Sequence, residues 1–559
     1  MKPIEKICKL MFDEMALSTD LTYSKSDDKI VGYEDLGSLG RNKNLANHSL
    51  VFMVQGLYSG WKQPISYLFA KNTVKSKYLK ILIAEIIKKL QDAGLTVVCT
   101  VCDQAAMNVR ALQLLKLDSN THPTKPYFKV NFKKIVCLFD VPHLLKSLRN
   151  ALLKYTVYYG ETKKAKFTYL RQAYEFDKSR RFQILRKIRE CFLYVNRHTL
   201  LKMKVSIAAK TLSSTMAAAI ETLVDCGKNI PSEAIETACF IQDVNNLFDS
   251  FNSTGIRVNK YNPPYRCALT KNSFHWQFWE SMKEKIKSWQ FYDETTGQTK
   301  STMPFKHGWL NNIEGIKLIW HICNEIGFKF LRTRMLNQDP LENVFSIIRQ
   351  YGAANVNPTC FQFISALKTS ILHNLVGYKS YGENCEDDAS HLLDNLRHFL
   401  SVDKLKVKSK ILEENENELL SCNVSVVENN MTFNDKFDLQ AVSYVGGFLI
   451  SKFKNDCDEC QKCLFAQNTD VQHIFTLYKE HDKSKLKLKY ITEELCVCVA
   501  KIYDLSVYYL NKFGEVNYIG KKLRIALERK INFSWFTCTS HFLDIKTKLL
   551  DAAINLIIY

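Results

Sequence analysis

The sequence predicts an α/β protein in which a mixed β-sheet is interrupted and then followed by long helical regions. Three observations predict this class. The first third of the 559 residues alternates strand-like and helix-like patterns, the next part is helical and basic, and two polar segments precede the C-terminal region. A chain of this length exceeds the roughly 100 to 200 residues of a typical domain, so several structural units are expected.

The first third contains five strand patterns and two helix patterns in a definite order. Strands are predicted in KLMFDEMALS, in two runs on either side of the turn YSGWKQP, in LTVVCTVCD and in KKIVCLFD. Helices are predicted in SKYLKILIAEIIKKLQDAG, which ends in a glycine suited to a helix C-terminus, and in AAMNVRALQLL. Three strands, a helix, a strand, a helix and a strand follow the order of the RNase H-like fold.

The last helix of that fold would have to carry an acidic residue facing the sheet. The helix directly after the fifth strand, VPHLLKSLRNALLKY, offers only His143, Lys146 and Arg149, which we expect to face outward. Residues 150 to 330 then read as an α-helical insertion with loops at NKYNPPYRC and TTGQTKSTMPFKHGW. The acidic helix residue is therefore expected farther along the chain.

Five segments follow from these patterns. The expected segments are the first part of the RNase H-like domain (1–148), a helical insertion (149–330), the last part of the RNase H-like domain (331–378), an acidic linker (379–436) and a helical C-terminal domain (437–559). The linker is inferred from the polar segments YGENCEDDAS and EENENELLSCNVSVVENN.

Charge and cysteine usage favour an intracellular protein that binds a polyanion. Lys and Arg number 77 against 57 Asp and Glu, for a formal net charge of +20, which favours phosphate contacts; mere solubility or an acidic membrane surface is the alternative. Many of the 18 cysteines lie in strand-like apolar runs, as reduced, buried thiols do. The apolar runs are too short to span a membrane, so no membrane partner is expected and the cytosol or nucleus is the expected compartment.

Three acidic residues are candidates for a metal site. Asp13 lies in the first strand and Asp103 closes the fourth, and these strands are neighbours in an RNase H-like sheet. In NQDPLENVFSIIRQYG, Asp339 can cap a helix, Pro340 suits its first turn, and Glu342 follows on that turn. Such oxygen ligands suit two Mg²⁺ ions. The alternative is that the strand-end residues are solvated and that Asp339 is only a cap.

The third carboxylate reaches the sheet if its helix docks by an apolar face. Helical spacing gives that face an apolar stripe of Leu341, Val344, Phe345 and Ile348. Two divalent cations held by the three carboxylates would activate a water or a DNA 3′-hydroxyl and stabilise the leaving oxygen.

Seven longer motifs occur in a fixed order. They are LMFDEMALSTDLTY, SGWKQPISYLF, VCDQAAMNVRAL, FDVPHLLKSLRNALL, KMKVSIAAKTLSSTMAA, LFDSFNS and LNQDPLENVFSIIRQYGAANVNPTCFQF. Together, over roughly residues 5 to 375, they resemble the P element transposase family, including its THAP-type relatives in animals. The resemblance implies an RNase H-like catalytic domain interrupted by a helical GTP-binding insertion, two-metal cleavage and strand transfer of DNA, a homo-oligomer on DNA and a nuclear location.

The resemblance implies particular site residues. Asp13, Asp103 and Glu342 would form the acidic triad that holds two Mg²⁺ ions. The implied GTP-site residues are Lys204, Val205, Ser213, Phe248, Asp249, Asn252 and Asp339. The sequence lacks the Walker A pattern, so this site would not be a P-loop.

The guanine base would be recognised by LFDSFNS. Asp249 would accept hydrogen bonds from N1 and N2 of guanine, Asn252 would bond the base edge and Phe248 would stack on it. From the residues alone, Asp249 as a solvated helix residue, Phe248 as a core aromatic and Lys204 as a surface cation are the simpler readings. The nucleotide would organise DNA binding rather than be hydrolysed.

The sequence also departs from the family pattern. It starts almost at the first catalytic strand, so we expect the N-terminal THAP-type zinc domain and coiled coil to be absent, and no CxxC is followed at a suitable distance by CxxH. ECFLYVNRHTLL looks short and has Leu193 where a basic residue is expected. Loss of the N-terminal DNA-binding region favours the alternative function, a truncated or domesticated transposase that is a catalytically inactive DNA- or protein-binding scaffold, whereas retention of all three acidic positions favours catalysis.

Two further features have a functional and a simpler interpretation. DECQKC places Cys457, Cys460 and Cys463 at CxxCxxC spacing, and with His473 they could bind Zn²⁺, although a reduced cysteine-rich loop is the favoured interpretation. Basic helices expected over residues 163 to 190 interleave Lys and Arg with aromatic residues, as a phosphate-contacting face or a solvated face would.

Overall fold

The computed structural model describes most of the chain and divides it into two compact units. The described residues are 2–24, 29–194, 199–228, 230–256, 263–354, 357–372, 391–392, 436–451, 453, 457–480, 488–513 and 519–558. The first unit comprises Met1–Phe167, Arg189–Ser213 and Cys239–Val402, and the second comprises Thr168–Ile188, Ser214–Ala238 and Asp403–Tyr559. The segments read as acidic linkers, 381–390 and 413–430, lie outside the described residues.

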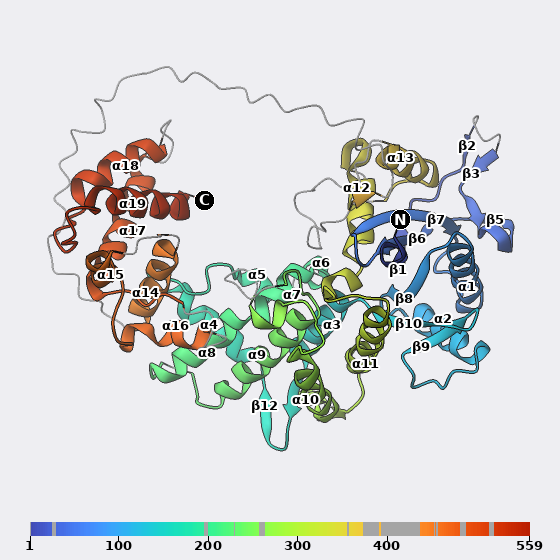
Figure 1. Ribbon diagram of the computed structural model, residues 1–559, viewed down its shortest axis with the longest axis horizontal. Helices are drawn as coiled ribbons and strands as arrows, with labels where there is room; N and C mark the ends of the chain where they lie inside the picture. The colour runs from blue at the N-terminus through green and yellow to red at the C-terminus, as the bar shows by residue number, and fades with distance from the viewer. Residues whose placement is uncertain are drawn as a thin grey trace. The chain divides into compact units, whose positions relative to one another are not determined.

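The first unit is built on a nine-stranded sheet whose five central strands are the predicted ones (Figure 1). In spatial order these strands are β7 (Trp61–Ala70), β6 (His48–Gly56), β1 (Ile7–Ala16), β8 (Thr96–Cys102) and β10 (Lys133–Phe139). β6 pairs antiparallel with both β7 and β1, whereas β8 runs parallel to β1 and to β10. The antiparallel start and parallel continuation confirm the predicted RNase H-like sheet.

The sheet extends beyond the predicted strands at both edges. The added strands are β4 (Tyr33–Asp35), β5 (Arg41–Leu45), β9 (Tyr127–Val130) and the short β15 (His391–Leu392). A separate two-stranded ribbon is formed by β2 (Thr22–Ser24) and β3 (Lys29–Val31). These strands span five residues or fewer, so they are too short for alternation of apolar residues to reveal them.

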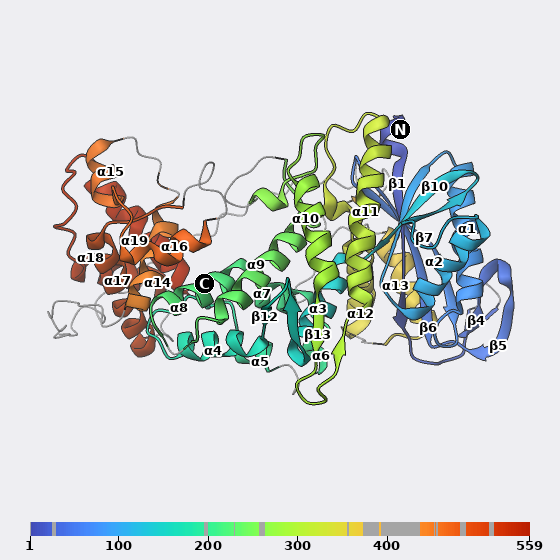
Figure 2. The same cartoon turned by 90° about the horizontal axis from the view of Figure 1, so that it is seen from below.

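Helices cover both faces of the sheet (Figure 2). On one face lie α1 (Ser76–Asp92) and α2 (Ala106–Asp118), both predicted, and on the other lie α11 (Pro304–Glu325) and α12 (Asp339–Ala354), followed by α13 (Cys360–Leu372). Gly315 lets α11 approach β10 closely, because a Cβ there would lie 2.7 Å from a methyl carbon of Leu138.

The segment between the two parts of the RNase H-like domain is mostly helical. Its helices in the first unit are α3 (Val141–Lys154), α5 (Glu190–Leu193), α6 (Thr199–Lys202), α7 (Val205–Thr211) and α10 (His275–Ser288), and α9 (Ala234–Ser250) begins in the second unit. The segment also contains a four-stranded sheet of β12 (Lys163–Ala165), β11 (Thr156–Tyr159), β13 (Gln290–Tyr292) and β14 (Thr299–Lys300). The second expected surface loop therefore contains β14 and the start of α11.

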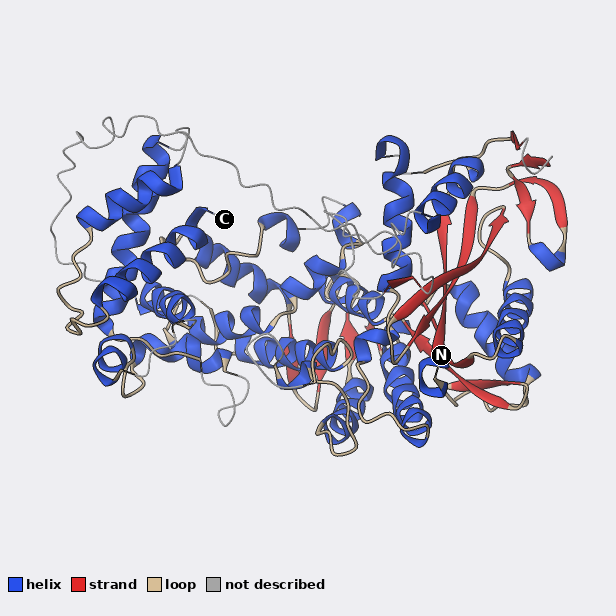
Figure 3. Ribbon diagram, turned by 45° about the horizontal axis from the view of Figure 1, so that its top comes forward, coloured by secondary structure: helices blue, strands red, loops and turns tan. Residues whose placement is uncertain are grey.

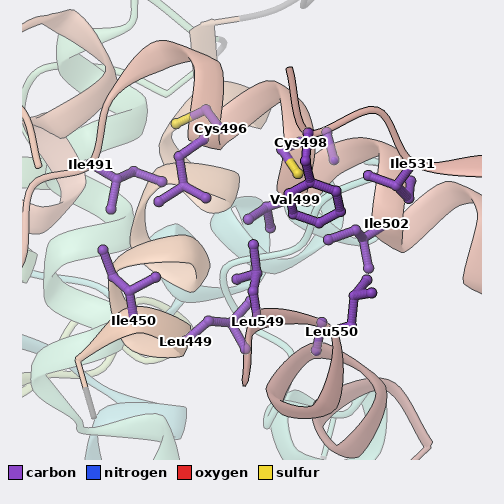
Figure 4. Close-up of a cluster of buried hydrophobic side chains, with 14 of the residues drawn as sticks. Leu449, Ile450, Ile491, Cys496, Cys498, Val499, Ile502, Ile531, Leu549 and Leu550 are labelled. Atoms are coloured by element: carbon purple, nitrogen blue, oxygen red, sulfur yellow. The ribbon is translucent and has the colours of Figure 1, made fainter. Parts of the chain in front are cut away.

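Helices make up the regular structure of the second unit. They are α4 (Phe167–Lys178), which begins at the last residue of the first unit, α8 (Ser214–Asp225), α14 (Lys436–Ile450), α15 (Asp458–Leu464), α16 (Ile474–Lys479), α17 (Glu493–Phe513), α18 (Ile519–Lys530) and α19 (Phe542–Ile558). Among the described residues, the strands in Figure 3 all belong to the first unit. The predicted helical C-terminal region is confirmed, and Figure 4 shows its core, including Leu449, Ile491 and Leu549.

The expected basic helices over residues 163 to 190 are wrong in extent. Only α4 continues as a helix there, preceded by β12 and followed by turns. The carboxylate of Asp177 accepts hydrogen bonds from the backbone N–H groups of Ile184 (2.7 Å) and Leu185 (2.9 Å), which closes a turn where the helix would otherwise run on. Within the described ranges, no helix is long and apolar enough to cross a membrane.

Buried hydrogen bonds attach the start of α12 to the sheet. Lys9 on β1 has no exposed surface, and its Nζ donates to the backbone carbonyl of Asn337. The side-chain amide of Gln338 donates to the carbonyl of Phe12 (2.9 Å), and its backbone N–H donates to Asp140 Oδ1 (2.7 Å). Residues 337 and 338 are therefore fixed to β1 and to the end of β10, directly before α12 begins.

Replacing Lys9 by Met should loosen α12. The substitution keeps an apolar stem but leaves the buried Asn337 carbonyl without this donor, at an expected cost of about 1–3 kcal/mol. Amide hydrogen exchange in α12 should accelerate and the unfolding midpoint should fall. Lys88→Met, at an exposed position on α1, is the matched control and should leave both unchanged. Equal exchange in the two variants would show that Lys9 does not hold the helix.

Candidate metal and nucleotide sites

Asp13 and Asp103 lie at the same end of neighbouring parallel strands. The register pairs Met11 of β1 with Val101 of β8, so two residues farther along each strand the chain reaches Asp13 and Asp103. Asp103 is held by the side-chain amide of Asn108 (2.7 Å) and the backbone N–H of Ala105 (2.9 Å). The structure thus brings together the two strand carboxylates that the sequence singled out.

Glu342 reaches this end of the sheet from the first turn of α12. The apolar stripe of the helix is buried, as expected, through Leu341, Val344, Phe345 and Ile348. The backbone N–H of Glu342 donates to the carbonyl of Gln338 (3.2 Å), so Asp339 is the first helical residue rather than the cap predicted from the sequence. The carboxylate of Asp339 instead accepts a hydrogen bond from the side-chain amide of Asn337 (3.1 Å).

The electrostatics of Asp13 show that the three carboxylates influence one another. Burial raises the pKa of Asp13 well above its usual range, and the negative charges of Glu342 and Asp103 raise it further. The pKa of Glu342 moves the other way: burial raises it, but the hydrogen bond and charge of His143, together with the charges of Lys146 and Arg349, lower it by more. A divalent cation at this position would relieve the repulsion that Asp13 experiences.

Two residues near the triad were not assigned a role from the sequence. His143 Nε2 lies 3.6 Å from Glu342 Oε1, and Arg149 of the same helix is fully buried, so the expectation that both face outward is wrong. Asp140, 2% exposed, caps α3 through the N–H of His143 (3.1 Å). The sequence could have predicted Asp140 as the N-cap of α3, because an aspartate two residues before a proline is typical of a helix start. The apolar face of α3 packs against α7 and α11, and His143 lies on the side of α3 that faces Glu342 of α12.

The charge on His143 depends on these neighbours. Burial lowers the pKa of His143, but the hydrogen bond with Glu342 and the charge of Asp140 raise it by more, so it lies above its ordinary value. Asp140 has a raised pKa, because burial outweighs the lowering effects of His143 and of the N–H of Gln338. His143 and Glu342 thus stabilise each other's charged forms beside Asp13.

The donor set suits hard divalent cations, and its spacing is open. All three ligands are carboxylates, the oxygen donors that Mg²⁺ prefers. Among the residues the structure describes, the three carboxylates do not come within 4.8 Å of one another as a set. Two divalent cations held by the three carboxylates would need a wider spacing of ligands than a single ion bound by all three.

The LFDSFNS motif lies at the end of α9 and is hydrogen-bonded to the segment before α12. Ser250 and Phe251 face the core, where the Phe251 ring stacks on Trp279 at 5.1 Å between centroids. The N–H of Ser253 donates to Thr333 Oγ1 (2.9 Å), and the N–H of Thr333 donates to Ser253 Oγ (2.8 Å). This pair joins the insertion to the 3-10 turn Thr333–Leu336, directly before Asp339.

Three residues of the motif, Phe248, Asp249 and Asn252, are half-buried or buried. Phe248 and Asp249 are half-buried, and Asp249 lies 3.8 Å from the Arg266 Nε and accepts from Asn245 (3.1 Å). Asn252 is 5% exposed, and its Oδ1 has no hydrogen-bond partner among the described residues. A buried amide oxygen without a donor is costly, so a ligand that supplies one would be stabilised there.

The remaining expected nucleotide residues lie around α7. Lys204 precedes this helix, Val205 begins it and Ser213 follows it, and all three are half-buried. α7 packs against α3. Arg149 of α3 also donates a hydrogen bond (3.0 Å) to the backbone carbonyl of Lys202, the last residue of α6. Lys204, Val205 and Ser213 belong to the first unit, as does the LFDSFNS motif.

The structure also places two further residues that the sequence singled out. Leu193, which stands where a basic residue is expected, is fully buried in α5. His473 does not face the cysteines of DECQKC: its ring nitrogens are within hydrogen-bond distance of the N–H of Asp470 (2.9 Å) and the carbonyl of Ile491 (3.0 Å). Cys463 contacts Thr537 Oγ1 instead (3.3 Å).

Comparison with known proteins identifies relatives of this chain. Three models of the TNP-like family match: the RNase H N-terminal domain over residues 1–116, the GTP-binding insertion domain over 142–264 and the RNase H C-terminal domain over 335–368. The structure resembles the Drosophila P element transposase strand transfer complex with a TM-score of 0.56 and 26% identity, over 66% of this chain and 78% of that chain. The chain is similar to the P element-like transposases.

Full-length relatives of this P element-like chain are longer than it is. Transposable element P transposase of Drosophila melanogaster is 25% identical over 532 residues, which are 93% of this chain and 64% of the relative. DNA transposase THAP9 of Homo sapiens is 22% identical over 569 residues, which are 98% of this chain and 61% of the relative. The chain therefore spans less than two thirds of the length of these relatives.

Asp13→Asn should stabilise this P element-like chain when no divalent cation is added. A raised carboxyl pKa means that the folded state holds a proton the unfolded state releases, so stability falls as pH rises from about 4. The neutral amide removes that loss. At pH 7.5 the variant should gain about 1 kcal/mol or more in unfolding free energy, while added Mg²⁺ should stabilise the natural chain and not the variant.

Asp92→Asn, at an exposed carboxylate at the end of α1, is the matched control and should change stability by less than about 0.5 kcal/mol. Thermal unfolding across pH 5 to 8, with and without Mg²⁺, makes the comparison. A loss of stability in Asp13→Asn at pH 7.5 without metal would contradict the repulsion inferred for this site.

Proposed function

We propose that this chain cleaves DNA and transfers DNA strands by a P element-type reaction at the site formed by Asp13, Asp103 and Glu342. The observation that carries this proposal is the convergence of three carboxylates from β1, β8 and α12 at one end of an RNase H-like sheet, where two of them raise the pKa of the third. Carboxylates gathered against their own repulsion are typical of a cation-dependent active site.

Mg²⁺ is the proposed metal. Asp13, Asp103 and Glu342 would hold two ions, which when bound supply an activated water or 3′-hydroxyl and charge stabilisation for the leaving oxygen. The protein's own contribution is positional. Asp103 is fixed by Asn108, and Glu342 by the attachment of α12 to Lys9 and Phe12.

The reaction has two steps with the same bond changes. In cleavage, a water oxygen bonds to phosphorus as a P–O bond of the DNA backbone breaks, and the departing 3′ oxygen takes a proton. In strand transfer, the 3′-hydroxyl oxygen bonds to a phosphorus of the target and loses its proton, while the target's own 3′ oxygen leaves. His143, close to Glu342, keeps that carboxylate ionised and oriented during both steps.

GTP is the proposed nucleotide, bound and not hydrolysed. Asp249 would accept the N1 and N2 hydrogens of guanine, the free Oδ1 of Asn252 would accept a further donor, and Phe248 would stack on the base. Lys204, Val205 and Ser213 would lie nearer the rest of the nucleotide. Because Ser253 bonds to Thr333 just before Asp339, an occupied nucleotide site would also steady the start of α12.

DNA is the proposed partner, in the nucleus, with the chain acting as a homo-oligomer. The formal net charge of +20 supports binding to a polyanion. The name of the similar solved structure, a P element transposase strand transfer complex, supports the same partner. The competing possibility is a scaffold that binds DNA without cutting it.

Glu342→Gln should abolish strand transfer and leave DNA binding intact. The amide keeps the shape of the side chain but removes the charge that a cation needs, so we expect a loss of roughly 100-fold or more in product. The assay incubates the chain with Mg²⁺ or Mn²⁺, GTP, a short duplex with a free 3′-hydroxyl and a supercoiled plasmid, and measures plasmid joined to the duplex.

Glu325→Gln, on the exposed surface of α11, is the control and should retain full activity. If the natural chain binds the duplex yet forms no product with either metal, the scaffold is the correct function. Equal activity of Glu342→Gln and the natural chain would show that the triad has been assigned wrongly.

Asp249→Asn should change the base preference of the nucleotide site from guanine to xanthine. Xanthine keeps the N1 donor but has an acceptor at position 2, which the Asn amide can match by donating where a carboxylate cannot. GTP affinity should fall roughly 10- to 100-fold and xanthosine triphosphate affinity should rise. Asp243→Asn, on the same helix and paired with Lys285, is the control and should change neither affinity. Unaltered nucleotide preference in Asp249→Asn would place the base elsewhere.

A further inference from the structure

Four potential metal ligands converge in the second unit, away from the carboxylates of the first. Cys457, Cys460, Cys538 and His541 each offer one ligand atom, and these four atoms all lie within 4.8 Å of one another. Among the residues the structure describes, this is the group of Cys, His, Asp and Glu that meets that distance. Cys460 and Cys538 are buried, and the other two are partly exposed.

The four residues come from two short motifs far apart in the sequence. Cys457 directly precedes α15 and Cys460 lies in its first turn, which gives CxxC. Cys538 and His541 come just before α19, in the segment that follows α18, which gives CxxH. Sequence inspection missed the pairing because the motifs are much farther apart than in a small zinc module.

The distances fit a tetrahedral zinc ion. Zn–S bonds of about 2.3 Å and Zn–N bonds of about 2.0–2.1 Å place two sulfurs roughly 3.8 Å apart and a sulfur and nitrogen roughly 3.5 Å apart. The Sγ atoms of Cys457 and Cys538 are 3.8 Å apart, and Cys538 Sγ lies 3.4 Å from His541 Nδ1. Both separations are close to the edges of the expected tetrahedron.

The surroundings explain what an ion would do there. The segment between α18 and α19 contributes Phe533 and Phe536 to the apolar core of the second unit, and α15 contributes Leu464. α19 reaches the same core through Leu549 and Leu550 (Figure 4). A cross-link from α15 to the start of α19 would therefore hold the segment between α18 and α19 against this core.

We propose that Cys457, Cys460, Cys538 and His541 bind one structural zinc ion that joins α15 to the start of α19. Four protein ligands fill the tetrahedron, so no position is left for substrate and the role is structural. Binding releases the protons of the thiols that become ligands. This site shares no residue with the carboxylate triad, and its occupancy does not depend on the proposed DNA chemistry.

Metal content of the purified full-length chain tests the proposal. The protein is produced with zinc in the medium, exchanged into excess Mg²⁺ to clear zinc from carboxylates, and analysed by inductively coupled plasma mass spectrometry. About one zinc ion per chain is expected. Cobalt substitution should give the near-ultraviolet charge-transfer bands of thiolate ligands. A chain without zinc, or one in which mass spectrometry finds Cys457 joined to another cysteine as a disulfide, would overturn the proposal.

Variants separate ligands from neighbours. Cys538→Ser and His541→Ala should lose most of the zinc, whereas His541→Cys should keep it, because a thiolate can replace the imidazole. Cys463→Ser is the matched control: it removes a cysteine of DECQKC that contacts Thr537 and should leave one zinc bound. Zinc retained in Cys538→Ser, or lost in Cys463→Ser, would show that the four ligands are not those named here.

Discussion

The first unit depends on buried hydrogen bonds that hold the start of α12 against β1 and β10. Glu342 lies more than two hundred residues after Asp13 and Asp103 in the sequence, and carboxylates repel one another when buried together. Lys9, Gln338 and Asp140 supply the opposing attachment: they connect residues 337 and 338 to the sheet by one side-chain and two backbone groups. These hydrogen bonds hold Glu342 beside Asp13 and Asp103 although the three carboxylates repel one another.

This arrangement also connects the two proposed ligands. Ser253 of the LFDSFNS motif is hydrogen-bonded to Thr333, Thr333 precedes Asp339, and Asp339 begins the helix that carries Glu342. A nucleotide bound at one end of this segment would restrict the helix at the other. Nucleotide binding without hydrolysis would then favour the geometry of the carboxylate site, which is a thermodynamic coupling of two sites through one rigid element.

Much of the fold could be predicted from the sequence, and the failures have physical causes. The five central strands, α1, α2 and the buried stripe of α12 carried strong apolar periodicity and were predicted correctly. The edge strands, the small sheet of the insertion and the turn after α4 are set by pairing and by side chains such as Asp177, which act over distances that periodicity does not record.

The site shows the same division. Asp13 and Asp103 follow from strand register, whereas Glu342 was a candidate from its helix pattern alone, and the family resemblance supported it across the insertion that separates it from the strands. His143 was expected to face outward, and only the packing of α3 turns it toward Glu342. Cys538 and His541 were overlooked since their partners lie in another motif.

The central claim is that Asp13, Asp103 and Glu342 form one cation site. Crystals of the full chain soaked in Mn²⁺ would test it directly, by anomalous scattering at the manganese absorption edge. The account predicts anomalous peaks between the three carboxylates that disappear in Glu342→Gln crystals. Manganese bound elsewhere, or no peak beside Asp13 in crystals of the natural chain, would contradict it.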